Sequence, residues 1–190
     1  MKSKRQLIFE TAARLFHRQG FKGTSLQEIA KEVGMEAPSL YNHIQSKSEI
    51  LSILLLTLAS RFDKGMDAIA SSSLSPIDKL KKLVGLHVSL TLENGNAMAL
   101  MLSDWIYLGD EARAEYLRMK DEYEERFRQI LEKGIEEGQL RQMDQNLMMF
   151  SILSTLRSLY AWTAKYSEYN PIELEIQISG ALLDGVLADS

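Results

Sequence analysis

The side chains that could do chemistry in this sequence are hydrogen-bonding and charged groups rather than nucleophiles or metal ligands. The chain of 190 residues has no cysteine, which excludes thiol catalysis, disulfide frameworks and cysteine zinc sites. Its histidines, His17, His43 and His87, lack HxxxH or HExxH spacing, so we expect no metal and no other cofactor. The sequence also lacks a phosphate-binding loop and a nucleophile–base motif, so an enzyme has little support.

The charged residues are distributed unevenly along the chain. The whole sequence carries 22 basic and 26 acidic residues, a net charge of −4. Residues 1–50 contain eight basic and five acidic residues, net +3, and the other 140 residues contain 14 and 21, net −7. An anion-binding segment attached to an acidic body would show this asymmetry, and so would a chance fluctuation.

Helical patterns position the polar groups of the first segment. Few prolines and glycines, with abundant Leu, Ala, Glu, Lys and Met, favour an all-α protein. Apolar residues at helical spacing predict a first helix over 2–19. Overlapping capping boxes, Thr24 with Gln27 and Ser25 with Glu28, predict the start of a short second helix.

A tight turn follows this second helix. Gly34 ends the helix, and a third short helix is predicted over 37–43. Ser46 and Glu49 then form a capping box that starts a long apolar helix over 47–70. Two short helices across a glycine-containing turn, between a packing helix and a capped helix, are the helix-turn-helix arrangement that enters the major groove of DNA.

The residues of this arrangement resemble the DNA-binding domain of the TetR family of bacterial repressors. The resemblance rests on TSLQEIAKEVG at 24–34, LYNHI at 40–44 and SKSEIL at 46–51, and it extends back through AARLF at 12–16 and GF at 20–21. It covers the first quarter of the chain, and its ordered motifs are far more specific than a bare helix-turn-helix pattern.

The resemblance implies which side chains meet DNA. Phosphate contacts would come from Thr24, Tyr41, His43 and Lys47, whose hydroxyl, ring and ammonium groups suit that task. The residues nearest the bases would be Glu36, Ala37, Ser39 and Asn42, and Asn42 has the amide that reads adenine. The predicted DNA-binding set is completed by Ser25. Taken singly, these residues also fit structural roles, with Thr24 as a helix cap, Tyr41 as a partly buried aromatic and Lys47 as an exposed charge. Glu36 and Gln45 depart from common family choices, so the operator sequence is not predicted.

The rest of the chain predicts five further helices after the one over 47–70. Start signals place them at 76–94, 96–107, 110–137, 144–166 and 171–188. We therefore expect a three-helix DNA-binding domain over 1–46 and a six-helix effector-binding and dimerisation domain over 47–190. The sequence shows no membrane span and no secretory leader, which favours a cytoplasmic protein.

The last two predicted helices are broadly apolar, and an isolated chain would expose much of that surface. In TetR-like proteins the last two long helices pair across a two-fold axis. The resemblance therefore implies that this chain forms a homodimer in the same way. A dimer would present two recognition helices to half-sites about 34–36 Å apart, so the operator should be palindromic. The predicted dimer contacts are Leu156, Leu159, Ile176, Gly180 and Leu183.

Aromatic and methionine residues between the two ends could line an adaptable apolar pocket, although at helical spacing such residues more often form plain core. Lone charges on apolar helices are usually exposed or paired with each other. Asp104 and Arg157 are therefore either exposed, paired with each other, or anchors for the polar end of an effector. The predicted effector pocket consists of Met66, Leu90, Met101, Asp104, Trp105, Tyr123, Phe127, Arg157 and Tyr160.

The C-terminal half resembles TetR-family repressors that control fatty-acid or steroid breakdown. This resemblance implies an acyl-CoA thioester as one effector candidate. Arg157 is a candidate to bind its phosphates, whereas the net charge of −7 on the residues after 50 does not favour a ligand with phosphates. The sequence thus predicts a ligand-responsive repressor that binds a palindromic operator as a homodimer and responds to a small hydrophobic effector. The alternative is a constitutive DNA-binding dimer whose C-terminal helices only dimerise.

Overall fold

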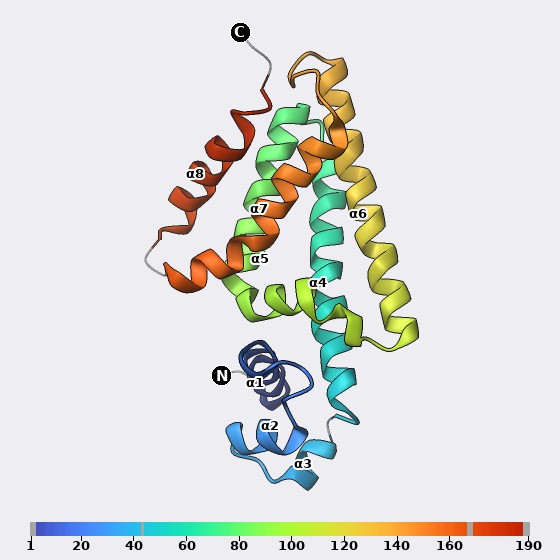
Figure 1. The fold of residues 1–190 in the computed structure, drawn as a ribbon, viewed down its shortest axis with the longest axis vertical. Coiled ribbons are helices and arrows are strands. Elements are labelled where there is room, and N and C mark those ends of the chain that lie inside the picture. Colours follow the sequence, from blue (N-terminus) through green and yellow to red (C-terminus); the bar gives the residue numbers. More distant parts are fainter. Residues whose placement is uncertain (1–2, 43, 167–168, 188–190) are drawn as a thin grey trace. The chain divides into compact units, whose positions relative to one another are not determined.

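The structure is a computed structural model that describes residues 3–42, 44–166 and 169–187. These residues form eight α-helices and one short 3-10 helix, with no β-strand among them (Figure 1). The prediction of an all-α chain is confirmed. Of the helices in this described part, none combines the length and the apolar character that crossing a bilayer requires.

Most of the elements begin where the sequence predicts. The elements are α1 Lys4–Gln19, α2 Leu26–Glu32, α3 Ala37–Tyr41, α4 Lys47–Ala70, α5 Pro76–Ser103, η1 Trp105–Tyr107, α6 Asp110–Glu136, α7 Gln145–Lys165 and α8 Pro171–Leu183. The capping residues explain this agreement. Asp144 accepts a hydrogen bond from the backbone N–H of Leu147 at the start of α7, and Asn170 accepts from the first turn of α8.

Several predicted boundaries differ from the structure by one residue or more. The helices expected over 76–94 and 96–107 are instead one helix, α5, followed by η1. Within α5, Asn94 has non-helical angles (φ −133°, ψ 32°), and its side-chain amide donates to the carbonyl of Leu90 at 3.0 Å. Two helices also end earlier than predicted, α3 at Tyr41 rather than 43 and α8 at Leu183 rather than 188, while α1, α6 and α7 differ by one or two residues at an end.

The chain packs as two units. The first comprises Met1–Ala59 and Asn96–Leu117, and the second comprises Ser60–Gly95 and Arg118–Ser190. The helices α4, α5 and α6 therefore each contain residues of both units. This is a division by packing, and the predicted functional division after residue 46 stays a prediction.

The first unit is built on aromatic packing around α1. Phe16 and Phe21 are buried and meet edge to face, with ring centroids 5.2 Å apart. Phe21 also stacks on Tyr107 of η1 at 5.3 Å, and His17 Nδ1 lies 2.9 Å from the amide oxygen of Asn96. The segment 96–117 is thus part of the same packing unit as the first three helices.

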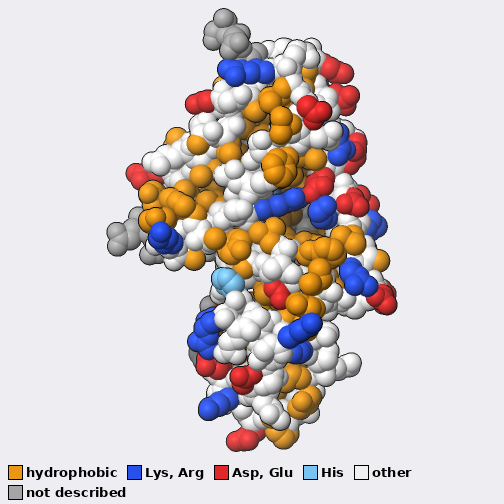
Figure 2. All heavy atoms as spheres, in the orientation of Figure 1, with side chains coloured by type: hydrophobic (Ala, Val, Ile, Leu, Met, Phe, Trp, Pro, Cys, Tyr) orange, Lys and Arg blue, Asp and Glu red, His pale blue; other side chains and the backbone are white. Residues whose placement is uncertain are grey.

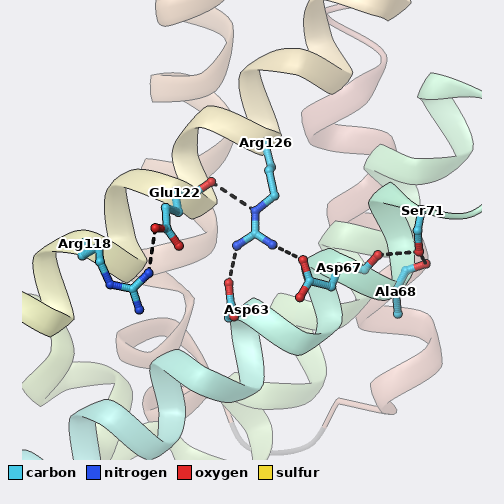
Figure 3. Close-up of polar contacts among 7 residues, drawn as sticks. All are labelled: Asp63, Asp67, Ala68, Ser71, Arg118, Glu122 and Arg126. Carbon is cyan, nitrogen blue, oxygen red and sulfur yellow. Dashed lines mark hydrogen bonds and ion pairs between the residues drawn. The ribbon is translucent and has the colours of Figure 1, made fainter.

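The second unit is a helical bundle in which α4, α5, α6 and α7 run beside one another (Figure 1). Gly65 of α4 allows a close approach to α5, because a Cβ there would lie 2.5 Å from a methyl carbon of Leu86. Figure 3 shows how α6 is tied to α4: the guanidinium of Arg126 donates to both Asp63 and Asp67. These ion pairs connect α6 to α4 at the surface of the bundle, in addition to the packing of apolar side chains inside it.

Candidate functional site

The short helix α3 presents polar side chains to solvent. Ser39, Tyr41 and Asn42 are exposed, while Leu40 between them is fully buried and fixes the helix to its own unit. Asn42 follows the last residue of α3 and keeps right-handed helical angles, so its amide continues the same exposed turn. This arrangement leaves hydroxyl and amide groups available for hydrogen bonds to an external partner.

The remaining residues predicted near the bases lie at the start of α3. Glu36 is exposed and is the N-cap residue, but its side chain makes no capping hydrogen bond, while Ala37 is half-buried. The carboxylate of Glu36 is thus not used by its own helix. His43 lies outside the described residues.

Thr24 is placed inward, which does not favour its predicted phosphate contact. Its side chain is 2% exposed, and its hydroxyl donates to the carbonyl of Gly20 at 3.0 Å. The cap of α2 is instead Ser25, whose hydroxyl accepts from the backbone N–H of Glu28. The two candidate capping boxes are therefore resolved in favour of Ser25.

The capping box also sets the electrostatics at the start of α2. The carboxylate of Glu28 accepts from the backbone N–H of Ser25 at 2.7 Å and from its hydroxyl at 2.8 Å. These hydrogen bonds, the backbone one first, hold the pKa of Glu28 below its ordinary value. Glu28 therefore stays ionised beside a positive helix N-terminus.

Lys47 is engaged by its own chain. Its ammonium donates to the backbone carbonyls of Phe21 at 2.8 Å, Thr24 at 2.9 Å and Lys22 at 3.3 Å, and it lies 4.7 Å from the centre of the Phe21 ring. An ammonium has three N–H donors, and these contacts account for all of them. Lys47 thus fastens the loop before α2 to the first residue of α4, a structural role that the sequence did not indicate.

The predicted effector residues are divided between the two units. Met101, Asp104 and Trp105 belong to the first unit, and the other six belong to the second. In the second unit Met66, Leu90, Tyr123 and Phe127 are buried in the core, while Arg157 and Tyr160 are half-buried. Their role as pocket-lining residues stays a prediction.

Asp104 and Arg157 each have a partner within their own unit. Arg157 donates to Glu124 of α6 at 2.5 Å, and the carboxylate of Asp104 accepts from the hydroxyl of Ser103 at 2.6 Å. Burial pushes the pKa of Glu124 up, but the hydrogen bonds and charges of Arg157 and, to a smaller extent, Lys120 outweigh it and hold this pKa below its ordinary value. The Arg157 charge is therefore already balanced within the bundle.

A buried polar cluster lies in the second unit, and sequence reasoning identified only one of its members. His87 of α5 has its Nε2 atom 2.9 Å from the hydroxyl of Tyr123 of α6, and Thr91 lies one helical turn beyond it. Burial, with a smaller effect of the Arg157 charge, lowers the pKa of His87 to about 3, and burial raises the pKa of Tyr123. Both side chains are therefore neutral at pH 7. The sequence did contain a signal for this cluster, because His87 and Thr91 are polar residues four apart on an otherwise apolar face of a helix.

The predicted dimer contacts fall into two groups. Leu156, Leu159 and Leu183 are buried in the core of their own unit and offer no side-chain surface to a partner. Ile176 is 66% exposed and Gly180 is half-buried, so these two lie where a second chain could reach them. The inward placement of the leucines does not favour their predicted role as dimer contacts. A sequence that is apolar on several sides of a helix does not reveal which side faces outward.

Other exposed apolar residues do lie on α7 and α8. Leu147 and Phe150 are exposed near the start of α7, and Ile172 is 69% exposed on α8, one turn before Ile176. Figure 2 shows hydrophobic side chains gathered on the surface over α8 and the end of α7. A helix that is apolar on its exposed face usually packs against another molecule.

Comparison with known families places both parts of the chain in one group of proteins. Residues 8–52 match the family model of bacterial regulatory proteins of the tetR family, and residues 73–186 match the model of the tetracyclin repressor-like C-terminal domain. The second match covers more than half of the chain.

Individual proteins agree with this placement. The HTH-type transcriptional repressor KstR2 of Mycobacterium tuberculosis is 27% identical over 141 residues, which is 73% of this chain and 70% of that protein. The crystal structure of the TetR family transcriptional regulator PfmR from Thermus thermophilus is 28% identical, has a TM-score of 0.81 and covers 93% of this chain and 97% of that one. The structure of AibR in complex with isovaleryl coenzyme A and operator DNA shares the fold, with 24% identity, a TM-score of 0.79 and coverage of 95% and 98%.

Proposed function

Because the chain belongs to the TetR family of bacterial transcriptional regulators, which are not enzymes, we propose that it is a repressor that binds a palindromic operator as a homodimer and is controlled by a small hydrophobic effector. Operator DNA requires that the protein act in the cytoplasm. The single observation that carries the DNA-binding part is the outward polar face of α3 on a buried anchor, Leu40.

The DNA contacts are assigned to the first 46 residues. Ser39 and Asn42 would meet base edges, where the Asn42 amide can pair with adenine and the Ser39 hydroxyl can donate or accept. Tyr41 would donate to a phosphate and Glu36 would accept from a cytosine amino group. Ser25 lies exposed at the start of α2, where a helix N-terminus favours a phosphate.

The dimer is assigned to the exposed faces of α7 and α8. The residues of the α7 face are uncharged along most of its length, comprising Leu147, Phe150, Ser151, Thr155, Ser158 and Ala161. On α8, Ile172 and Ile176 are followed by the small residues Gly180 and Ala181, which permit close helix approach. These faces support a two-fold interface, in which the same surface of each chain meets its copy.

The effector is assigned to the second unit, with acyl-CoA thioesters as the candidate that the resemblance implies. The isovaleryl coenzyme A in the AibR complex supports this class in a protein of the same fold. Within this chain, the buried methionine and aromatic side chains Met66, Tyr123 and Phe127 suit an apolar acyl group. The Arg157 guanidinium would have to leave Glu124 to bind a phosphate of coenzyme A.

Selection from a random duplex library at near-physiological salt tests the DNA-binding proposal, because non-specific phosphate attraction is then reduced. We expect enrichment of one palindrome by the native chain. Asn42→Ala should relax the preference at one base position of each half-site. Gln19→Ala, which removes an exposed side-chain amide at the end of α1 outside the predicted DNA-binding set, serves as the matched control. Failure of the native chain to enrich any palindrome would contradict the proposal.

The enriched duplex then serves as the probe for the effector. Titration with isovaleryl-CoA, decanoyl-CoA and free coenzyme A separates recognition of the acyl group from recognition of the nucleotide. We expect an acyl-CoA to change the affinity for the palindrome while coenzyme A does not. An operator affinity that no acyl-CoA changes would contradict the acyl-CoA assignment and would favour a constitutive DNA-binding dimer if other hydrophobic ligands also fail.

A further inference from the structure

Two buried polar atoms on α5 stand out within the second unit. His87 is 3% exposed and Thr91 is 1% exposed, and residues four apart share one face of a helix. Among the described residues, His87 Nδ1 and Thr91 Oγ1 are the buried side-chain atoms that have no hydrogen-bond partner. Buried polar groups are nearly always satisfied, so an adjacent unsatisfied pair requires an explanation.

The contact with Tyr123 determines what His87 can offer. A phenol is a better hydrogen-bond donor than a neutral imidazole N–H, so we assign the Tyr123 hydroxyl as the donor to His87 Nε2 at 2.9 Å. The single ring proton of His87 then lies on Nδ1. His87 therefore offers an N–H donor, and one turn away Thr91 offers a hydroxyl that can donate or accept.

The surroundings of this pair are apolar and neutral. The Phe62 ring lies 4.7 Å from the His87 ring, centre to centre, and the Phe62 and Tyr123 rings lie 6.0 Å apart. Two cations have charges that reach this region: Arg157 is bound to Glu124 at 2.5 Å, and Arg126 is bound to Asp63 and Asp67. An anion buried here would lack a free counter-charge, whereas a neutral oxygen would satisfy both polar atoms.

From this arrangement we propose that His87 Nδ1 and Thr91 Oγ1 bind an uncharged carbonyl or hydroxyl oxygen within the apolar part of the effector. A ketone or ester-type carbonyl has two lone pairs, one for each donor, and a hydroxyl can accept from His87 while it donates to Thr91. The apolar part of the molecule would lie against Phe62 and its neighbours. This inference rests on the proposed function, because it names the chemistry by which the effector is recognised.

The experiment compares four molecules of nearly equal size: butyrophenone, 1-phenylbutan-1-ol, butylbenzene and 4-phenylbutanoate. Binding to the full chain without DNA is measured by calorimetry and by the shift in melting temperature. We expect butyrophenone or the alcohol to bind at least tenfold more tightly than butylbenzene, and the anion to bind no better than butylbenzene.

Three variants locate the effect. Thr91→Val keeps the side-chain shape and His87→Phe keeps a ring, and each should reduce the preference for the oxygen-containing molecules several-fold while butylbenzene binding persists. Ser89→Ala removes an exposed hydroxyl from the same helix and should leave the preference unchanged. The unliganded Thr91→Val protein should melt no lower than the native chain, because the change removes an unsatisfied buried group.

Equal affinity for the ketone, the alcohol and the hydrocarbon, or no binding of any of the four, would overturn the inference. So would a preference that survives in both His87→Phe and Thr91→Val. These measurements use no DNA, so they are independent of the palindrome selection. An oxygen preference in a chain that selects no palindrome would support the site while refuting the repressor, and a selected palindrome without the preference would do the reverse.

Discussion

The two packing units differ in which of their notable side chains are exposed and which are buried. In the first unit, polar groups either point outward, as Ser39 and Asn42 do, or are satisfied internally, as the Lys47 ammonium is. In the second unit, Ile172 and Ile176 point outward, while His87 and Thr91 keep unsatisfied atoms in the interior. Exposed polar groups are hydrated until a partner arrives, whereas buried unsatisfied ones destabilise the free protein. The contrast therefore suggests that the first unit meets a polar partner at its surface and the second an apolar one.

The largest expected effect comes from the apolar surface of the second unit. Ile176→Glu places a charge on the proposed interface, so we expect a monomer in sedimentation and a loss of operator affinity of roughly a hundredfold, since two half-sites are no longer bound together. Leu74→Glu, at another exposed apolar residue, is the matched control. A dimer that persists in Ile176→Glu would refute the proposal that the exposed apolar face of α8 binds a second chain.

The next effect tests the internally satisfied lysine of the first unit. Lys47→Ala removes three hydrogen bonds from the loop before α2, so we expect unfolding to become easier by about 1–3 kcal/mol in urea melts. Lys31→Ala removes an exposed charge and should change stability little. If Lys47 acts mainly on DNA, stability would stay the same and the salt slope of binding would fall by about one unit.

A pH measurement tests the buried histidine of the second unit. The pKa of His87 is about 3 in the folded chain and about 6.5 when unfolded, so the unfolded chain takes up a proton first. The contribution of His87 to stability is therefore constant above about pH 7.5 and falls by about 2 kcal/mol as the pH drops to 5, above the range in which carboxylates titrate. His87→Phe should abolish that slope, and an unchanged slope in the variant would place the titration elsewhere.

The smallest effect concerns the capping box of the first unit. Ser25→Ala leaves the backbone N–H of Glu28 without its acceptor, so we expect a loss of about 1 kcal/mol in the free energy of unfolding. Ser48→Ala, an exposed serine in the first turn of α4, should cost less. Equal effects would mean that the cap does not hold α2.

The sequence predicted what local signals determine. Capping residues placed the starts of α2, α7 and α8, and polar residues of the motif predicted an exposed α3 face. Contacts made by the folded loops were not predictable in this way. Thr24 turns inward to donate to Gly20, four residues earlier, and Lys47 finds its carbonyl partners some 25 residues earlier in the sequence.

The spacing of apolar residues also could not predict which face of α7 and α8 is exposed. Leu156 and Ile176 look alike in a sequence that is apolar on several sides, yet one is buried and the other exposed. His87 is a similar case, because its polar partner Tyr123 lies on another helix, 36 residues away. Reasoning about single helices does not reveal which polar atoms remain unsatisfied after packing.

The interruption of α5 at Asn94 also bears on which insertions the chain can tolerate. An α-helix has 3.6 residues per turn, so one extra residue inside unbroken α4 would turn every later side chain by about 100° and move its buried residues to another face. At Asn94 the helical angles are already lost for one residue, and the side chain covers the carbonyl of Leu90. We therefore expect a one-residue insertion at Asn94 to cost the chain less stability than the same insertion inside α4.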